Sequence, residues 1–197
     1  MAVRVVIAED EAIIRLDLRE ILEGEGYEVV GETGRGDEAI TLVRDHRPDV
    51  AILDIRMPGM DGLAAAREIS ADGHSAVLIL TAFSQRNLID EARDAGALAY
   101  LVKPFTQTEL VPAIEVALGR FKEMQAIKAT NASLEEQLDT RRKLDRAKGL
   151  LMDDLGYKEG QAFEYIRDTA MRTRRKIRDI AQDLIDGTLQ APELPKS

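Results

Sequence analysis

The sequence contains no cysteine, which excludes disulfide bridges, thiolate metal sites and cysteine nucleophiles. It has only two histidines, His46 and His74, so a histidine-rich metal centre is excluded as well. Tryptophan is absent and aromatic residues make up 4% of the chain, which argues against a stacking platform for bare single strands. No apolar run approaches the roughly 20 residues that cross a bilayer, and the first residues turn acidic too early for a secretory signal. We therefore expect a cytoplasmic protein.

The 197 residues that are present suffice for one full domain and a smaller one. Their net charge of −9 is unevenly distributed, because residues 1–118 carry a net charge of −11 and residues 141–187 a net charge of +3. This asymmetry indicates two functions on one chain, the second of which can involve contact with a polyanion.

Residues 1–118 alternate short apolar runs with longer amphipathic segments. The short runs are rich in Val, Ile and Leu and predict five strands, over residues 3–8, 27–32, 50–54, 76–81 and 99–102. Helical periodicity predicts helices over residues 11–23, 36–46, 62–70, 85–95 and from 107 onward. Strands separated by helices predict a doubly wound α/β domain with a parallel five-stranded sheet.

Polar side chains stand at the carboxyl ends of four of these strands. They are Glu9 and Asp10, Asp54, Thr81 and Lys103. Ligands of open parallel sheets bind at this edge. A strand that simply ends in solvent would explain any one of these residues. It does not explain three carboxylates, a hydroxyl and an ammonium together, because isolated buried charges are costly.

This set of side chains fits phosphoryl transfer to a carboxylate. An aspartate becomes a nucleophile toward phosphorus when a divalent cation neutralises the phosphoryl oxygens. Asp54 is the candidate nucleophile, Glu9 and Asp10 are further acids for the cation, and Lys103 is a fixed positive charge for the phosphate. Mg²⁺ fits best, because it prefers oxygen ligands and needs few protein groups. Thr81 supplies a hydroxyl that can hydrogen-bond the attached phosphoryl group.

The segments IAEDE, LDIRMPGMDG, LTAFS and VKPF carry these residues, and through them residues 1–118 resemble the receiver domains of two-component response regulators. The resemblance implies a flavodoxin-like fold in which a sensor histidine kinase phosphorylates Asp54. It also implies that Asp10, Asp54 and the backbone carbonyl of Arg56 ligate Mg²⁺, with Glu9 helping directly or through water. Glu9 departs from the family pattern, in which an aspartate is often found, and this leaves its distance to the metal open.

The same resemblance implies that Thr81 and Tyr100 reorient on phosphorylation and that the Lys103–Pro104 peptide bond is cis. For Tyr100, a partly buried core aromatic without a switching role is an equal alternative. An aspartate-nucleophile phosphatase would need a second carboxylate where Arg56 stands, and the GETGRGD stretch lacks the spacing and lysine of a nucleotide loop. We therefore predict no enzyme beyond the receiver's own phosphotransfer and dephosphorylation.

Residues 119–140 are predicted to form a helical linker. Apolar residues from Leu110 to Leu138 recur at alternating spacings of three and four, as in a coiled-coil seam with Asn131 setting the register. The residues in two core positions, Arg120 and Arg141, do not fit that seam. A single long helix that packs on its own receiver therefore remains an alternative to a phosphorylation-dependent homodimer.

Residues 141–187 are predicted to form a small all-α domain of three helices, followed by a disordered tail over 188–197. The predicted core takes its residues from all three helices, Phe163 included. Gly149 lies inside the first helix, where glycine costs about 1 kcal/mol relative to alanine. Such a glycine indicates close approach of another backbone or tight packing of a neighbouring helix.

The run RTRRKIR, residues 172–178, places five cations within seven residues, expected around the second helical turn. It can bind phosphates or form a solvated charged face. With RAKGLLM and QAFEYIRDTAM, it resembles the ANTAR domain, an RNA-binding output module of transcription antiterminators. The resemblance implies binding of a structured, hairpin-containing RNA, with the contacts in the region of Lys148, Gly149, Arg172, Arg174 and Arg175. Two alternatives stay open: a DNA-binding helical output and a protein-interaction output.

Overall fold

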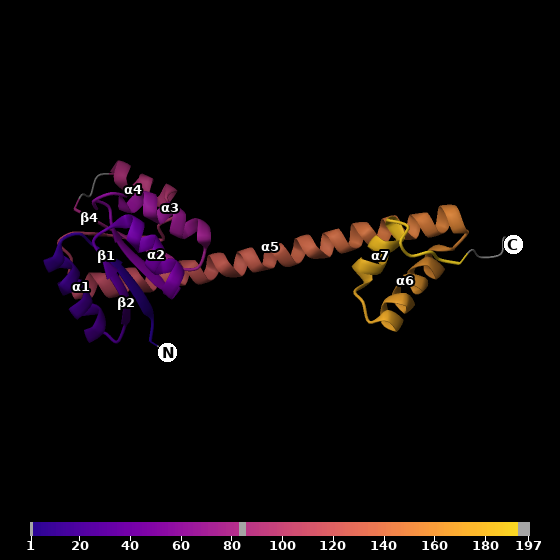
Figure 1. Cartoon of the computed structure of the whole chain (residues 1–197), viewed down its shortest axis with the longest axis horizontal. Helices are drawn as coiled ribbons and strands as arrows, with labels where there is room; N and C mark the ends of the chain where they lie inside the picture. Colours follow the sequence, from indigo (N-terminus) through magenta and orange to yellow (C-terminus); the bar gives the residue numbers. More distant parts are fainter. Residues whose placement is uncertain (1, 83–85, 193–197) are drawn as a thin grey trace. The chain divides into compact units, whose positions relative to one another are not determined.

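The computed structural model describes residues 2–82 and 86–192. The chain divides into two compact units, Met1–Gln125 and Ala126–Ser197. Each unit has its own hydrophobic core, and the long helix α5 (Gln107–Leu155) contributes residues to both (Figure 1).

The first unit is built on one parallel sheet in the order β2-β1-β3-β4-β5. Its strands are β1 (Arg4–Ala8), β2 (Glu28–Thr33), β3 (Val50–Asp54), β4 (Ala76–Thr81) and β5 (Ala99–Val102). Every residue of β3 and β4 is buried. The continuous apolar runs of these two strands are explained by helices that cover both faces of the sheet.

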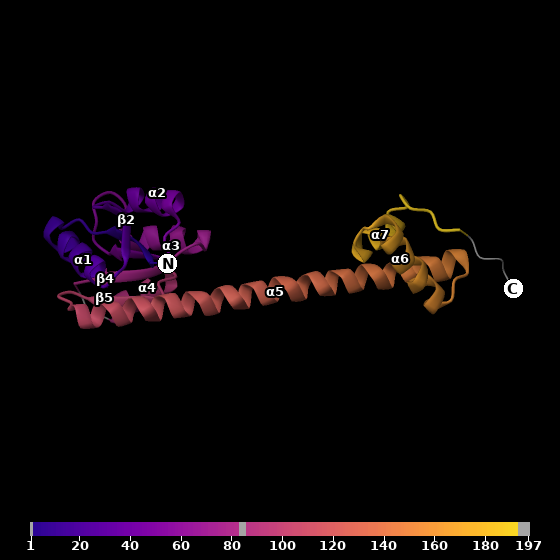
Figure 2. The same ribbon diagram turned by 90° about the horizontal axis from the view of Figure 1, so that it is seen from below.

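The helices α1 (Ala12–Gly24), α2 (Gly36–His46), α3 (Gly62–Asp72) and α4 (Arg86–Asp94) complete this unit with the first part of α5. Side chains of α2, α3 and α4 pack on one face of the sheet, and those of α1 and α5 pack on the other. Figure 2 shows α2 and α5 on opposite sides of the strands. The predicted doubly wound α/β fold is confirmed, although Gln85, the first residue of one predicted helix, lies outside the described residues.

The second unit packs the end of α5 against α6 (Glu159–Thr173) and α7 (Ile177–Ile185). The placement of Phe163 in its core is wrong, because that side chain is 39% exposed. The core face of α6 carries Ala162, Ile166 and Ala170, and Phe163 stands about 100° round the helix from Ala162. The core aromatic is instead Tyr157, whose ring meets Tyr165 edge to face with 5.8 Å between the ring centroids.

The segment after α7 also differs from the prediction. Residues 188–192 were expected to be disordered, but Leu189 and Ala191 pack against the core of the second unit. The hydroxyl of Tyr157 donates a hydrogen bond to the carbonyl of Pro192 at 2.8 Å. Residues 193–197 of the predicted tail lie outside the described residues.

Helix α5 is tied to the first unit by polar contacts. Arg120 donates to the Leu98 carbonyl at 2.8 Å, and Gln125 donates to the Gly73 carbonyl at 2.6 Å. Arg120 thus has a partner within its own receiver, which favours the single-helix interpretation at this position of the seam. No helix among the described residues is long and apolar enough to cross a membrane.

Candidate functional site

The polar residues predicted at the strand ends lie together in the structure. Asp10, Asp54, Thr81 and Lys103 line one cavity of about 420 Å³, and Arg56 lines it as well. The parallel register places them there, because Asp54 of β3 pairs with Leu80 of β4 and Thr81 pairs with Val102 of β5. Parallel strands bring their carboxyl ends to one edge of the sheet, which is the physical reason why the sequence pattern locates the site.

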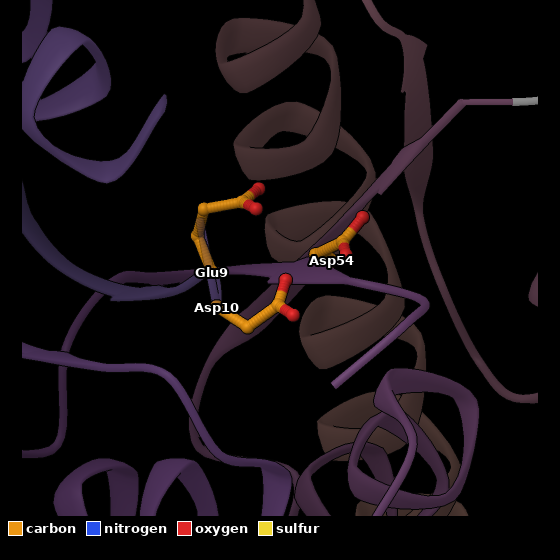
Figure 3. Close-up of side chains that lie close together, drawn as sticks. All are labelled: Glu9, Asp10 and Asp54. Carbon is orange, nitrogen blue, oxygen red and sulfur yellow. The ribbon is translucent and has the colours of Figure 1, made fainter. Parts of the chain in front are cut away.

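Three carboxylates cluster beside this cavity. Glu9, Asp10 and Asp54 each offer an oxygen atom, and these atoms lie within 4.8 Å of one another (Figure 3). Glu9 is fully buried, Asp54 is 6% exposed, and Asp10 faces solvent. Glu9 thus contributes its carboxylate to the cluster although it is longer than the aspartate that the receiver pattern favours.

One ammonium group faces these carboxylates. Lys103 Nζ lies 2.6 Å from Glu9 Oε2 and 3.0 Å from Asp54 Oδ1. Burial raises the pKa of both carboxyls, and Lys103 only partly offsets this effect. Burial opposes the charged form of Lys103, yet its pKa is raised because its hydrogen bonds to Glu9 and Asp54 and the charge of these two carboxylates together outweigh burial.

Three clustered carboxylates against a single ammonium leave an excess of negative charge. Such a group of hard oxygen donors fits a divalent cation, which would remove the repulsion between the carboxylates. Mg²⁺ suits the group, because it needs only a few protein ligands and keeps water in its other positions.

Backbone groups hold the carboxylates in place. The Arg56 amide donates to Asp54 Oδ2 at 3.2 Å, and the Glu11 amide donates to Glu9 Oε1 at 3.2 Å. The Arg15 guanidinium of α1 donates to the backbone carbonyl of Glu9. Sequence analysis did not identify Arg15, since an arginine on an amphipathic helix gives no signal of a backbone contact.

Two glycines shape the loops around the site and were also missed. A Cβ atom on Gly62 would lie 1.9 Å from the Asp54 carbonyl oxygen, and one on Gly36 would lie 2.3 Å from the Met60 carbonyl oxygen. The loop after β3 therefore returns against Asp54 only because residue 62 has no side chain. Asp61 stabilises the same turn by accepting a hydrogen bond from the Ala64 amide at 2.7 Å, as the N-cap of α3.

The residues predicted to switch differ in exposure. Thr81 is 3% exposed at the end of β4, whereas Tyr100 on β5 is 46% exposed. Tyr100 is thus more exposed than a core aromatic, and its switching role stays a prediction. The Lys103–Pro104 peptide bond is cis, the isomer that the receiver resemblance implies.

The basic run 172–178 spans the end of α6, a short connection and the start of α7. Arg174 ends α6 in the left-handed conformation, with φ of 54°. Arg175 pairs with Asp183 at 2.6 Å. Arg172 and Arg174 make no ion pair with any residue that the structure describes.

The two other predicted RNA contacts lie on the second unit's part of α5. Lys148 pairs with Asp145 at 3.0 Å and with Glu159 at 3.1 Å. A Cβ atom on Gly149 would meet nothing within 4 Å. No packing among the described residues explains this glycine, so the expectation of a tightly packed neighbouring helix is wrong, and the approach of a backbone from another molecule stays a prediction.

A doubly wound domain with an acidic cluster and a lysine at its strand ends has the architecture of a response regulator receiver domain. The response regulator receiver domain family matches residues 5–115, and the ANTAR domain family matches residues 132–185. The chain belongs to the response regulators that combine a receiver domain with an ANTAR domain.

Relatives agree with this assignment. The chain is 50% identical over 190 residues to the transcriptional regulatory protein PdtaR of Mycobacterium tuberculosis (strain ATCC 25618 / H37Rv). The matched region covers 96% of this chain and 92% of PdtaR. It is 36% identical to the chemotaxis protein CheY of Bacillus subtilis over 60% of this chain and all of CheY. A solved structure of the receiver domain of the putative response regulator NarL from Mycobacterium tuberculosis matches with a TM-score of 0.58 and 35% identity, over 60% of this chain and 97% of that one.

This membership confirms the predicted response regulator with a receiver domain and an ANTAR output, a combination that is not a catalytic enzyme family. A receiver domain implies phosphorylation of an aspartate by a histidine kinase, and an ANTAR domain suggests RNA binding.

Proposed function

We propose that Asp54 accepts a phosphoryl group from a sensor histidine kinase and that this modification controls RNA binding by the ANTAR domain, which prevents transcription termination. The single observation that carries the receiver part is the cluster of Glu9, Asp10 and Asp54 with Lys103 at the strand ends. Asp54 is the member of this cluster whose carboxylate lies in the cavity and contacts both Lys103 and the Arg56 amide.

The residues around Asp54 have separate roles in this proposal. Glu9, Asp10, Asp54 and the backbone carbonyl of Arg56 hold Mg²⁺, which when bound neutralises the phosphoryl oxygens during attack. Lys103 stays charged, as its raised pKa requires, and compensates the negative charge that phosphorylation adds. The Thr81 hydroxyl donates a hydrogen bond to the attached phosphoryl group, and Tyr100 reorients in response.

The RNA-binding part rests on the cations of the second unit. Arg172 and Arg174 offer exposed guanidinium groups for phosphates or bases, and Lys148, Gly149 and Arg175 complete the proposed contact region. RNA loops and hairpins suit such a surface, because their unstacked bases are accessible.

Coupling between the two units is proposed to run through α5. Ile127, Leu134 and Leu138 on this helix are all more than half exposed. An exposed apolar stripe of this spacing supports a homodimer that forms on phosphorylation. Sedimentation of phosphorylated and unmodified protein tests this step, and identical masses with identical RNA affinities would contradict it.

Crosslinking to cellular RNA tests the whole proposal, with intact protein and an Asp54→Asn variant compared under phosphorylating conditions. We expect hairpin-bearing leader RNAs to be enriched with the intact protein and several-fold less with the variant. Equal enrichment of these RNAs with the intact protein and the variant would support RNA binding and refute its control by phosphorylation. If neither the intact protein nor the variant enriches such RNAs, the RNA-binding output is refuted.

A further inference from the structure

A groove of about 550 Å³ runs between α5 and the start of α7 within the second unit. Its lining combines two kinds of surface. Leu144 and Ile177 provide apolar area, and Gln137 and Thr140 provide hydrogen-bond donors and acceptors. Along α5, Gln137 Nε2 donates to Ser133 Oγ at 3.4 Å and Thr140 Oγ1 donates to the Glu136 carbonyl at 2.8 Å, which leaves Gln137 Oε1 and the lone pairs of Thr140 Oγ1 as acceptors for a ligand.

One end of the groove concentrates positive charge around a carboxylate. Glu136 Oε1 of α5 lies 2.5 Å from Arg178 Nη1 and 3.7 Å from Lys176 Nζ. Lys176 is also the N-cap of α7, and its side chain makes no capping hydrogen bond. The first amides of a helix that lacks a side-chain cap favour an anion, as does the helix dipole. Glu136 therefore places its carboxylate at a position suited to a phosphate.

We propose that this groove binds one nucleotide of an RNA loop, whose phosphate replaces the Glu136 carboxylate on Lys176 and Arg178. The inference rests on the proposed RNA-binding function and specifies a contact site for it. The base lies on Leu144 and Ile177, and its edge meets Gln137 and Thr140, because specific RNA recognition uses unstacked bases with both apolar and hydrogen-bonding contacts.

The ion pairs of Glu136 make this exchange feasible. All three charged side chains are at least one third exposed, and exposed ion pairs contribute little to stability. A phosphate that brings its base into the groove can displace the carboxylate, whereas an anion without a base is repelled by it. Glu136 thus lowers affinity for RNA in general and favours a nucleotide that fills the groove.

Removal of the Glu136 charge tests the inference, with Glu135 as the matched control. Glu135 is the neighbouring exposed residue, and it forms no ion pair with the described part of the chain. The affinity of full-length protein for a fluorescein-labelled pool of RNA hairpins with randomised loops is measured by anisotropy at fixed salt. We expect Glu136→Gln to tighten binding about three- to fivefold, the range that two exposed ion pairs allow, and Glu135→Gln to leave it nearly unchanged.

A double-mutant cycle identifies the cause of the gain. In a Lys176→Gln, Arg178→Gln background, Glu136→Gln should give no gain, because the cations that it frees are absent. An undiminished gain in that background, an equal gain from Glu135→Gln, or an equal gain on duplex DNA would each overturn the proposal. If wild-type protein fails to bind the pool at all while circular dichroism shows it folded, the proposed RNA-binding function fails together with the groove.

Discussion

The two units hold their functional charges in opposite ways. In the receiver, Glu9, Asp54 and Lys103 are buried or nearly so and are each other's partners. In the ANTAR unit, the cations are more exposed than Lys103, and several pair with carboxylates that an RNA phosphate could replace. The sheet edge of the receiver thus holds a few charged side chains in fixed positions for one reaction. The helical surface of the ANTAR unit carries many cations, and a bound ligand contacts only some of them.

The two units also differ in the space around their glycines. Gly62 lies where a side chain would collide with the backbone of Asp54, whereas Gly149 and Gly160 have open space around them. The receiver glycine is therefore required by the fold. Gly149 has no such role within the chain.

The largest effect is expected from Gly62→Ala. The added methyl group would lie 1.9 Å from the Asp54 carbonyl oxygen, so the loop must move and shift Asp54. We expect the free energy of unfolding of the receiver to fall by about 3 kcal/mol or more, measured by urea denaturation. Gly160→Ala, at an open position of α6, is the control. Equal stability of both variants would contradict the packing described here.

Truncation of a core side chain in the ANTAR unit should lower the free energy of unfolding of that unit by a smaller amount and leave the receiver folded. Ile166 of α6 is fully buried in the three-helix core. We expect Ile166→Ala to cost this unit about 2–4 kcal/mol, while the receiver still takes up phosphate from a small donor. Met171→Ala, on an exposed position of the same helix, should leave stability nearly unchanged. Loss of phosphate uptake in Ile166→Ala would show that the units do not fold separately.

A weaker effect is expected from Glu9→Gln, which removes one carboxylate from the acidic cluster. Mg²⁺ affinity, measured by calorimetry, should fall about tenfold or more, because the remaining charge no longer offsets dehydration of the ion. Glu11→Gln, a neighbouring exposed carboxylate outside the cluster, serves as control. Unchanged affinity in Glu9→Gln would mean that Glu9 pairs only with Lys103 and takes no part in metal binding.

The smallest effect is expected from Gly149→Ala. Because the position is open, alanine should stabilise α5 by roughly 0.5–1 kcal/mol. If an RNA backbone approaches this glycine, as the ANTAR resemblance implies, affinity for the hairpin pool should fall although the fold is more stable. Higher stability with unchanged RNA affinity would remove Gly149 from the RNA contacts.

Sequence reasoning located the receiver site because strand ends are determined by short local patterns. Asp54 and Thr81 end buried apolar runs, and parallel pairing alone brings such ends together. The roles of Arg15 and Gly62 could not be predicted, because they depend on how a loop or helix returns to a distant backbone.

The ANTAR unit was less predictable for a physical reason. Helical periodicity located the buried face of α6, which carries Ile166 and Ala170, but it does not fix the edge of that face, and Phe163 was therefore wrongly assigned to the core. The basic run 172–178 joins α6 to α7, and Arg174 ends α6 in a conformation with positive φ that arginine rarely adopts, which the residue pattern did not predict. Leu189 and Ala191 were taken for a disordered tail, since isolated apolar residues near a terminus give no local signal of packing.

The most direct test of the account is the intact mass of the protein after incubation with a small phosphodonor and Mg²⁺. We predict the gain of one phosphoryl group, carried by the peptide that contains Asp54, and no gain with Asp54→Asn or after removal of the metal with a chelator. An unchanged mass of the wild-type chain, or an equal gain in Asp54→Asn, would contradict the assignment of Asp54 as the phosphoryl acceptor.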